Sequence, residues 1–500
     1  MSELLVKVDF EHIEAERDPN LVHYFVETQS FYRIFGGKKM YVIGRKGTGK
    51  STIYSAIENM PRNSDMLVAG LTFDDYPWGL HNQVRDETKS IDAAHTTTWR
   101  YIILIELAKL LLEEAKQIGK QPEELRAVAK FVQSAYGTAK PSLKELLTSL
   151  FKRLRQLKRI ELPRIGQTGA AGGSVEFEEG IAKEKAILDT VKVAADAIQE
   201  AILGLLTKKH YFVLFDKLDD GWDNTDAFKS SMVGLLRSAR DLNIEANRRN
   251  KLLRCVVFLR SDIYDCLQYN DKNKAFPDIE FLAWTEASLD RLINKRIAKS
   301  LGLRSEKNAW DKIFERETMR QRTSNFRYIV RRTLLRPRDL IAFCQECKTR
   351  ALHNKHDMIL NSDVYEAEAM FSERTYREFL DEMHKQFPFV DKLFEVLRRL
   401  HCERFDFYRF LAEFQRARIP RLDARSALKI LFDYSIVGVT RVGGRVGGST
   451  VEFKYTDPLI QLDFSRQMVA HPCLKKHLKL IEKRARKHPA TEESSEAEAP

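Results

Sequence analysis

Eight consecutive residues near the amino end have the types and spacing that bind phosphate. Gly44-Arg45-Lys46-Gly47-Thr48-Gly49-Lys50-Ser51 is a glycine, four residues, a glycine, a lysine and a serine. Small residues let backbone amides converge on phosphate oxygens at the start of a helix, the lysine reaches the outer phosphates, and the serine hydroxyl can hold Mg²⁺. A plain glycine turn is the alternative. The pattern predicts that a nucleoside triphosphate contacts Gly44, Lys46, Gly47, Thr48, Gly49, Lys50, Ser51 and Thr52.

Acidic residues after a later apolar run could complete a metal site. Asp216 directly follows Tyr211–Phe215 (YFVLF), so its carboxylate would project from a strand tip toward Mg²⁺ held by Ser51. Asp219 and Asp220 follow three and four residues later, and either could orient or deprotonate the attacking water, with Asp219 the preferred candidate. The alternative is that these acids cap the following helix or form a solvated turn.

The elements that must position these residues alternate between strands and helices. A strand at 39–44 leads into the glycine-rich loop, and residues 50–60 have the apolar spacing of a helix. Continuous apolar runs separated by helices are typical of parallel strands covered on both faces. We therefore expect an α/β fold, a P-loop NTPase core with a parallel sheet. Its other strands are expected at 66–73, 211–215, 254–259 and 279–284.

Helical segments interrupt this sheet and follow it. Helices at 99–119, 122–137, 141–160 and 179–206, with a glycine-rich strand-and-turn patch at 163–176, predict a large helical insertion at about 80–209 of a core spanning 1–285. Residues 286–380 are expected to form a helical lid. Helices at 388–400, 405–416 and 424–433 precede a two-stranded ribbon with a glycine-rich tip, which predicts a winged-helix domain at 381–482. A disordered basic-then-acidic tail is expected at 483–500.

Three further strings carry a family resemblance. YFVLFDKLDDGWD, VVFLRSDIYD and LLRPRDLIAF resemble the second acidic motif, the sensor-1 strand and the sensor-2 helix of the AAA+/STAND/KAP branch of P-loop ATPases. More narrowly, the chain is similar to bacterial ATPases that share a GRKGTGKS loop, an FLRSDIYD strand and a carboxy-terminal winged helix, and that often appear in antiviral defence loci. The resemblance covers roughly residues 15–345.

The resemblance implies roles for particular residues. It makes ATP the nucleotide, assigns Lys50 and Ser51 to phosphate and metal, and places Asp216 in the magnesium shell. It puts Arg260 or Ser261 at the sensor-1 position, near the terminal phosphate, and Arg338 at sensor 2. Lys217 departs from the family pattern, because many such ATPases have a glutamate there, so a slow switch is as consistent with the sequence as a fast motor.

Composition limits the class of protein and its partners. The 500 residues carry 83 lysines and arginines against 71 acids, a formal charge of +12, which fits contact with nucleic acid or simply a soluble basic surface. No stretch approaches 18 uncharged apolar residues, so no transmembrane helix and no membrane contact are expected. The acidic amino terminus lacks a signal-peptide pattern, which favours the cytoplasm.

Several basic clusters have two interpretations. The seven arginines between 320 and 338 could supply an arginine finger across an oligomer interface or pair with acids within the fold. Residues 151–160 (FKRLRQLKRI) could lie on nucleic acid or form the solvated face of a helix. In the predicted winged helix, a DNA contact and a protein contact are both open, and the residues concerned are Arg416, Arg418, Arg421, Arg425, Arg441 and Arg445.

A lone CxxC pair, Cys344 and Cys347, lacks the second pair that a structural zinc site needs, so two thiols near a helix surface are expected.

The leading hypothesis is a magnesium-dependent ATP-binding and hydrolysing switch in an antiviral-defence or DNA-associated complex. Such a switch would form a homo-oligomer or bind an effector protein. The alternative is a nucleic-acid-binding or scaffold protein that uses ATP as a regulatory ligand with little turnover. Salt-dependent DNA or RNA binding without phosphate release would distinguish the alternative.

Overall fold

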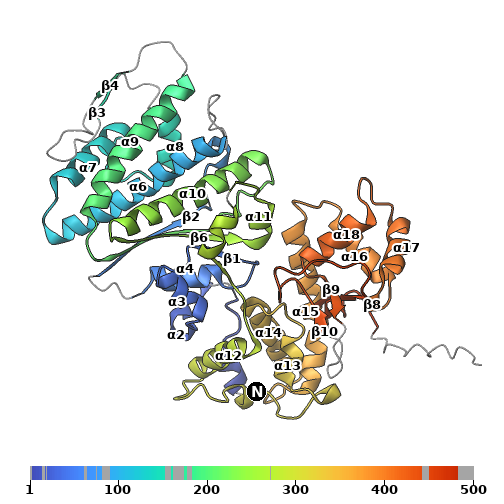
Figure 1. The fold of residues 1–500 in the computed structure, drawn as a ribbon. Helices are drawn as coiled ribbons and strands as arrows, with labels where there is room; N and C mark the ends of the chain where they lie inside the picture. Colours follow the sequence, from blue (N-terminus) through green and yellow to red (C-terminus); the bar gives the residue numbers. More distant parts are fainter. Residues whose placement is uncertain are drawn as a thin grey trace, which may run out of the picture. The chain divides into compact units, whose positions relative to one another are not determined.

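The computed structural model (Figure 1) divides into two compact units, and each is described separately. The first unit comprises Ser2–Ile313 and Leu335–Gln345, and the second comprises Phe314–Leu334 and Glu346–Pro500. The predicted boundaries at 285/286 and 380/381 stay predictions. The structure describes residues 3–13, 17, 18, 20–60, 65–74, 76–81, 91–152, 159–161, 174–176, 183–270, 272–441 and 450–481.

A five-stranded parallel sheet forms the centre of the first unit, which confirms the predicted α/β class with a P-loop NTPase core. Strand β6 lies between β5 and β1, so the strand that ends in Asp216 is not adjacent to the strand that leads into the glycine-rich loop. In spatial order the strands are β2 (Met66–Thr72), β5 (His210–Asp216), β6 (Leu252–Arg260), β1 (Tyr41–Gly44) and β7 (Ile279–Phe281).

The register brings the chemically important strand ends to one edge of this sheet. Gly44 of β1 pairs with Arg260 of β6, and Thr72 of β2 pairs with Asp216 of β5. Because all strands are parallel, their carboxyl ends share that edge, which is where ligands bind in open α/β sheets.

Alternate residues of the strands enter two separate cores, which explains their continuous apolar runs. Tyr211, Val213 and Phe215 pack under the helices of the insertion, whereas Phe212 and Leu214 face the core formed with the helices near the amino end. Figure 1 shows α6 and α10 on one side of the sheet and α3 and α4 on the other. Those helices are α3 (Gln29–Phe35), α4 (Lys50–Glu58), α6 (Ile91–Ile118) and α10 (Asp226–Arg248).

The large helical insertion is present, with one correction. The expected helix at 141–160 is wrong at its end, because α8 stops at Lys152 and Arg159–Glu161 form β3, which pairs antiparallel with β4 (Ser174–Glu176). Pairing with a distant segment overrides local helical spacing there. Most of the basic segment 151–160 and of the glycine-rich patch lies outside the described residues. The insertion's helices are α5 (Trp78–His81), α6, α7 (Glu123–Tyr136), α8 (Leu143–Lys152) and α9 (Lys183–Leu205).

Shorter elements complete the first unit. Helix α14 (Pro337–His353) begins in this unit and runs past Gln345 into the second. The remaining elements are α1 (Glu3–Lys7), α2 (Leu21–Tyr24), α11 (Ser261–Cys266), η2 (Lys272–Asp278), α12 (Glu286–Ser300) and η3 (Trp310–Lys312).

The second unit is helical and ends in a four-stranded sheet of order β10-β9-β11-β8. Strands β9 and β10 pair antiparallel, as expected of the two-stranded ribbon. Its tip, 442–449, and residues 482–500 lie outside the described residues, and the winged-helix interpretation stays a prediction. The elements are η4 (Arg320–Arg322), α13 (Asn325–Val330), α15 (Asn361–Met383), α16 (Val390–Arg399), β8 (Arg404–Phe405), α17 (Phe407–Ala417), α18 (Ala424–Asp433), β9 (Val437–Arg441), β10 (Thr450–Glu452), β11 (Met468–Ala470) and η5 (Pro472–Leu474).

Across the described residues, every helix is too short or too polar to cross a lipid bilayer.

Candidate nucleotide-binding site

The glycine-rich loop connects β1 directly to α4. Gly47 has φ +81° and Gly49, the residue before the first turn of α4, has φ +94°, a backbone region that only glycine enters at little cost. A Cβ atom on Gly47 would also lie 3.0 Å from Cβ of Arg338. The two glycines therefore shape a loop whose amides precede a helix amino end, as a phosphate site requires.

Two hydrogen bonds hold this loop from outside, and a third closes it from within. Trp284 Nε1 donates to the carbonyl of Thr48 over 2.8 Å, and Arg336 Nη1 donates to the carbonyl of Lys46 over 3.0 Å. Thr48 Oγ1 closes the turn by donating to the carbonyl of Arg45 at 2.8 Å. These bonds use carbonyl groups of the loop and leave its shape preorganised. Neither Trp284 nor Arg336 was assigned this role from the sequence.

Lys50 lies at the base of the loop. Its ammonium donates to the carbonyls of Gly44 at 2.9 Å and Arg45 at 3.1 Å. Burial lowers the pKa of Lys50, and the negative charges of Asp219 and Asp216 oppose that shift. A cation held beside the loop amides is suited to bind the outer phosphates of a nucleotide.

Asp216 and Ser51 form an oxygen pair at the end of β5. Asp216 is buried, and burial raises the pKa of its carboxyl group, while a hydrogen bond from Ser51 and the charge of Lys50 lower it. Mg²⁺ prefers oxygen ligands such as a hydroxyl and a carboxylate. The residues therefore fit a Mg²⁺ ion at this strand end, where Ser51 and Asp216 would hold it.

The two acids that follow Asp216 have different neighbours. Asp219 Oδ2 lies 3.3 Å from Arg260 Nη1. Burial, together with Asp74 and Asp219, raises the pKa of Asp220 to about 6. Neither acid caps the next helix, because the cap of α10 is Thr225, so the capping alternative is wrong.

Lys217 points to an acid that the sequence did not single out as a site residue. The residue has φ +58°, and its ammonium lies 3.0 Å from Asp74 Oδ1. Asp74 follows β2 as Asp216 ends β5, and both acids line the same cavity. Lys217 thus pairs with a carboxylate that follows the adjacent strand.

The two arginines assigned by resemblance differ in how they are held. The Arg260 guanidinium is forked on Asp262, with distances of 3.0 Å and 2.6 Å, whereas Ser261 is the first residue of α11. Arg338 is half-buried at the start of α14 and lines the cavity beside Gly47. Among the described residues, no acid lies within ion-pairing distance of Arg338, so its charge is available to a phosphate.

One cavity of about 460 Å³ unites these residues within the first unit. It is lined by Lys50, Asp216 and Asp219, which the sequence motifs singled out, and by Arg260 and Arg338, which the family resemblance suggested. Its volume falls in the range of about 300–1,000 Å³ that small-molecule sites occupy. Apolar side chains that could enclose a planar base also line it, namely Leu21, Tyr24, Phe25, Val26, Leu292 and Ile341.

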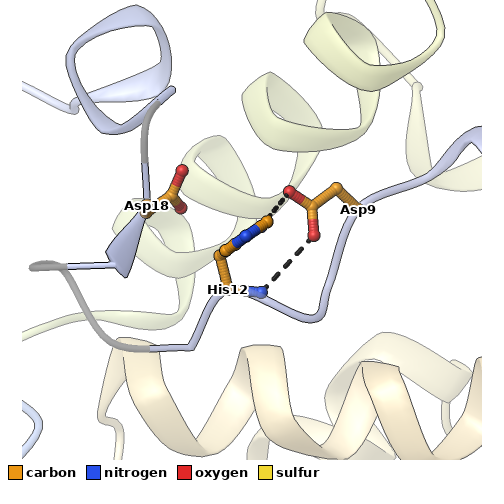
Figure 2. A group of neighbouring side chains, drawn as sticks. All are labelled: Asp9, His12 and Asp18. Atoms are coloured by element: carbon orange, nitrogen blue, oxygen red, sulfur yellow. Dashed lines mark hydrogen bonds and ion pairs between the residues drawn. The ribbon is translucent and has the colours of Figure 1, made fainter.

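A charged cluster next to this cavity attaches the segment that precedes α2 to helix α12. Figure 2 shows the His12 ring directed at Asp9, with Asp18 nearby, and His12 Nδ1 lies 2.7 Å from Asp9 Oδ2. Arg296 of α12 lies 3.1 Å from Asp18 Oδ2 and donates to the carbonyls of Asp9 and His12. The three side chains could geometrically approach a metal ion, but the buried guanidinium already supplies their positive charge.

The structure also shows the surroundings of two arginines from the 320–338 cluster and of the CxxC cysteines. Arg332 pairs with Glu368 at 2.7 Å and Arg336 with Asp339 at 2.9 Å, so the pairing interpretation is correct for these two arginines. The expectation that Cys344 and Cys347 lie near a helix surface is wrong, because both are completely buried and burial raises the pKa of Cys344.

Comparisons with known proteins give partial matches. Residues 287–380 match the family model described as the FunZ-associated C-terminal helical domain. The chain is 24% identical over 406 residues to the putative transposon gamma-delta 80.3 kDa protein of Escherichia coli K12, covering 78% of this chain and 53% of that protein. The chain thus spans about half the length of this curated relative.

Three solved structures match most of this chain, at low identity and low TM-score. Aeropyrum pernix ORC2 has a TM-score of 0.38 at 12% identity over 93% of this chain and 96% of that chain. The structure of Drosophila ORC bound to DNA has a TM-score of 0.34 at 12% identity, covering 96% of this chain and 91% of that chain. Pyrobaculum aerophilum Cdc6p has a TM-score of 0.28 at 13% identity, covering 90% of this chain and 91% of that chain.

Proposed function

We propose that this protein is a magnesium-dependent switch of the AAA+/STAND type that binds and hydrolyses ATP. The observation that carries the proposal is a single cavity. The glycine-rich loop, Lys50, Asp216 and Arg338 all line it. The loop amides and Lys50 would bind the phosphates, and Arg338 would neutralise charge on the transferred phosphoryl group. Mg²⁺ bound by Ser51 and Asp216 would supply Lewis-acid stabilisation of the phosphates.

Water activation is assigned to the loop after β5. Asp219 and Asp220 both line the cavity, and Asp220 has a pKa raised to about 6 by its burial and its acidic neighbours. A general base works best when its pKa is close to the working pH. Asp220 can therefore accept a proton from the attacking water, and Asp219 lies in the same cavity as the other candidate. A role in an antiviral-defence or DNA-associated complex stays a prediction.

Magnesium-dependent stabilisation tests the site directly. Adding ATP with Mg²⁺ at about 100 times the dissociation constant should stabilise the folded protein by about 2.7 kcal/mol, and removing Mg²⁺ with EDTA should reduce this. All five tryptophans, Trp78, Trp99, Trp222, Trp284 and Trp310, belong to the first unit, so their fluorescence during thermal unfolding reports on it.

Asp216→Asn should abolish the difference between the samples with Mg²⁺ and with EDTA, because it removes a charged metal ligand. Asp226→Asn is the matched control, since Asp226 is exposed on α10 and does not line the cavity. A Mg²⁺ effect that persists at full size in Asp216→Asn would refute the metal assignment.

A second candidate function is binding of a nucleic-acid backbone by the turn between α17 and α18. Arg418 and Arg421 are exposed there and have φ values of +47° and +59°. Non-glycine residues in this region cost about 1–3 kcal/mol each and cluster at functional sites. Within the described part of the chain neither arginine has an acid at ion-pairing distance. Arginines on an exposed turn, without an acidic partner, are suited to contact phosphate groups.

Salt dependence tests this second candidate. Changing both Arg418 and Arg421 to Ala should weaken binding to a labelled duplex DNA and reduce the slope of log affinity against log salt by about 0.9 per lost phosphate contact. Arg377→Ala is the control, because Arg377 is exposed in the same unit but pairs with Glu373 at 2.9 Å. An unchanged slope in the double variant, measured by fluorescence anisotropy, would remove the turn from consideration.

A further inference from the structure

Arg260 occupies a central position at the carboxyl edge of the sheet. It is the last residue of β6, and it pairs in register with Gly44, the first residue of the glycine-rich loop. Its side chain lines the cavity although only 11% of that side chain is exposed. A buried guanidinium needs partners for its donors, so the identity of those partners decides what it can do.

Two acids share this guanidinium. Asp262 accepts from Arg260 Nε at 3.0 Å and from Nη2 at 2.6 Å, a two-point fork. The other terminal nitrogen, Nη1, donates to Asp219 Oδ2 at 3.3 Å. Asp219 lines the cavity, whereas Asp262 does not. The arginine is therefore anchored by an acid that does not line the cavity, and it contacts one that does, Asp219, the preferred candidate for activating water.

The two contacts differ in strength. A two-point arginine–carboxylate fork fixes the plane of the guanidinium, whereas a single bond of 3.3 Å is at the long end of hydrogen-bond geometry. A phosphate group in the cavity would compete with Asp219 for Nη1 more easily than with Asp262 for the other two nitrogens. The fork therefore leaves Nη1 as the nitrogen whose contact with Asp219 a phosphate can replace most easily.

We propose that Asp262 is a positioning residue that holds Arg260 so that the terminal phosphate of ATP and the Asp219 carboxylate compete for the same guanidinium nitrogen. This inference rests on the proposed ATP function. When ATP binds, its terminal phosphate takes Nη1 and releases Asp219 toward water. ADP lacks that phosphate and leaves Asp219 paired. The site therefore frees its candidate base only when a nucleotide with a terminal phosphate is bound.

Nucleotide preference tests the proposal without requiring turnover. Affinities for a non-hydrolysable ATP analogue and for ADP, both with Mg²⁺, are measured by titration of tryptophan fluorescence. Asp262→Asn removes the charge and one acceptor of the fork, so Arg260 loses its orientation. We expect this variant to lower the affinity for the ATP analogue about tenfold, the effect of one charge-assisted hydrogen bond, and to leave the affinity for ADP within about twofold.

A second variant should act in the opposite direction. Asp219→Asn removes the charge that competes for Nη1, so the preference for the ATP analogue over ADP should rise rather than fall. Asp262→Glu, which keeps the carboxylate, should recover part of the preference lost in Asp262→Asn. Asp265→Asn is the control, because Asp265 is exposed on the same helix α11 and does not line the cavity.

The outcomes separate the two proposals. Equal losses of affinity for both nucleotides in Asp262→Asn would show a merely structural role and overturn the positioning proposal. An unchanged or lowered preference in Asp219→Asn would overturn the competition, even if Asp262→Asn folds poorly. A wild-type protein that binds neither nucleotide would refute the proposed ATP function itself, and the positioning role with it.

Discussion

Replacing Lys50 with methionine is expected to lower magnesium-dependent ATP hydrolysis about 10²–10³-fold, the cost of removing one preorganised charge from a phosphoryl-transfer site. The ammonium lies within 3.1 Å of two loop carbonyls and shares the cavity with Asp216, Asp219 and Arg338. Methionine keeps most of the side-chain length, so the loop keeps its volume while the charge is lost. Release of phosphate and binding of a fluorescent ATP analogue measure the two effects.

The fold should tolerate this change. Burial lowers the pKa of Lys50, so the protein already destabilises its charged form, and an apolar side chain removes that cost. Lys38→Met is the matched control, because Lys38 is exposed just before β1, at the opposite end of the same strand. Normal hydrolysis by Lys50→Met, with activity lost in Lys38→Met, would disprove the assignment of the loop.

The sequence predicted the parts of the site that depend on local pattern. The glycine-rich loop needs only neighbouring residues, and Asp216 is marked by the apolar run before it. Because parallel strands present their carboxyl ends at one edge, two motifs more than 160 residues apart could be expected to meet. The cavity lined by both Lys50 and Asp216 agrees with that expectation.

Contacts that depend on register and on distant pairing could not be predicted. Asp74 joins the site because β2 pairs with β5, and Trp284 reaches Thr48 across 236 residues. The fork between Arg260 and Asp262 spans only two residues, yet the access of the Arg260 side chain to the cavity depends on where β6 lies in the sheet. Side-chain direction at a strand end follows from tertiary packing, which a motif does not encode.

The seven arginines between 320 and 338 could not be assigned separate roles from their charge alone. Their sequence has no nearby acid to suggest partners for most of them, yet Glu368 lies 2.7 Å from Arg332 in the folded second unit. Arg338 lines the cavity, whereas Arg336, two residues earlier, pairs with Asp339. Two arginines only two residues apart thus have different contacts, which the sequence between them does not reveal.

Arg336→Ala is expected to destabilise the first unit by about 3–5 kcal/mol, because it removes the guanidinium that is ion-paired with the buried Asp339 carboxylate. Arg336 Nε lies 3.0 Å and 2.9 Å from the two Asp339 oxygens, and both side chains are at most 4% exposed. The substitution also removes the hydrogen bond to the carbonyl of Lys46, so the glycine-rich loop loses a support. Urea unfolding followed by tryptophan fluorescence reports on this unit.

Two comparisons identify the cause of that loss. Arg338→Ala should cost less than about 1 kcal/mol, the usual effect for a charge without a buried partner, while weakening nucleotide binding. Combining Arg336→Met with Asp339→Leu should recover most of the stability, because apolar side chains of similar volume can replace a buried ion pair at little cost.

The double variant also separates stability from nucleotide binding. It should still bind ATP more weakly than the wild type, since the support at the Lys46 carbonyl is not restored. If Arg336→Ala unfolds at the wild-type urea concentration, the ion pair contributes nothing to the unit. If the stabilised double variant binds ATP with wild-type affinity, the loop does not depend on Arg336. Stability and nucleotide affinity, measured on the same three variants, therefore separate the role of the buried ion pair from that of the hydrogen bond.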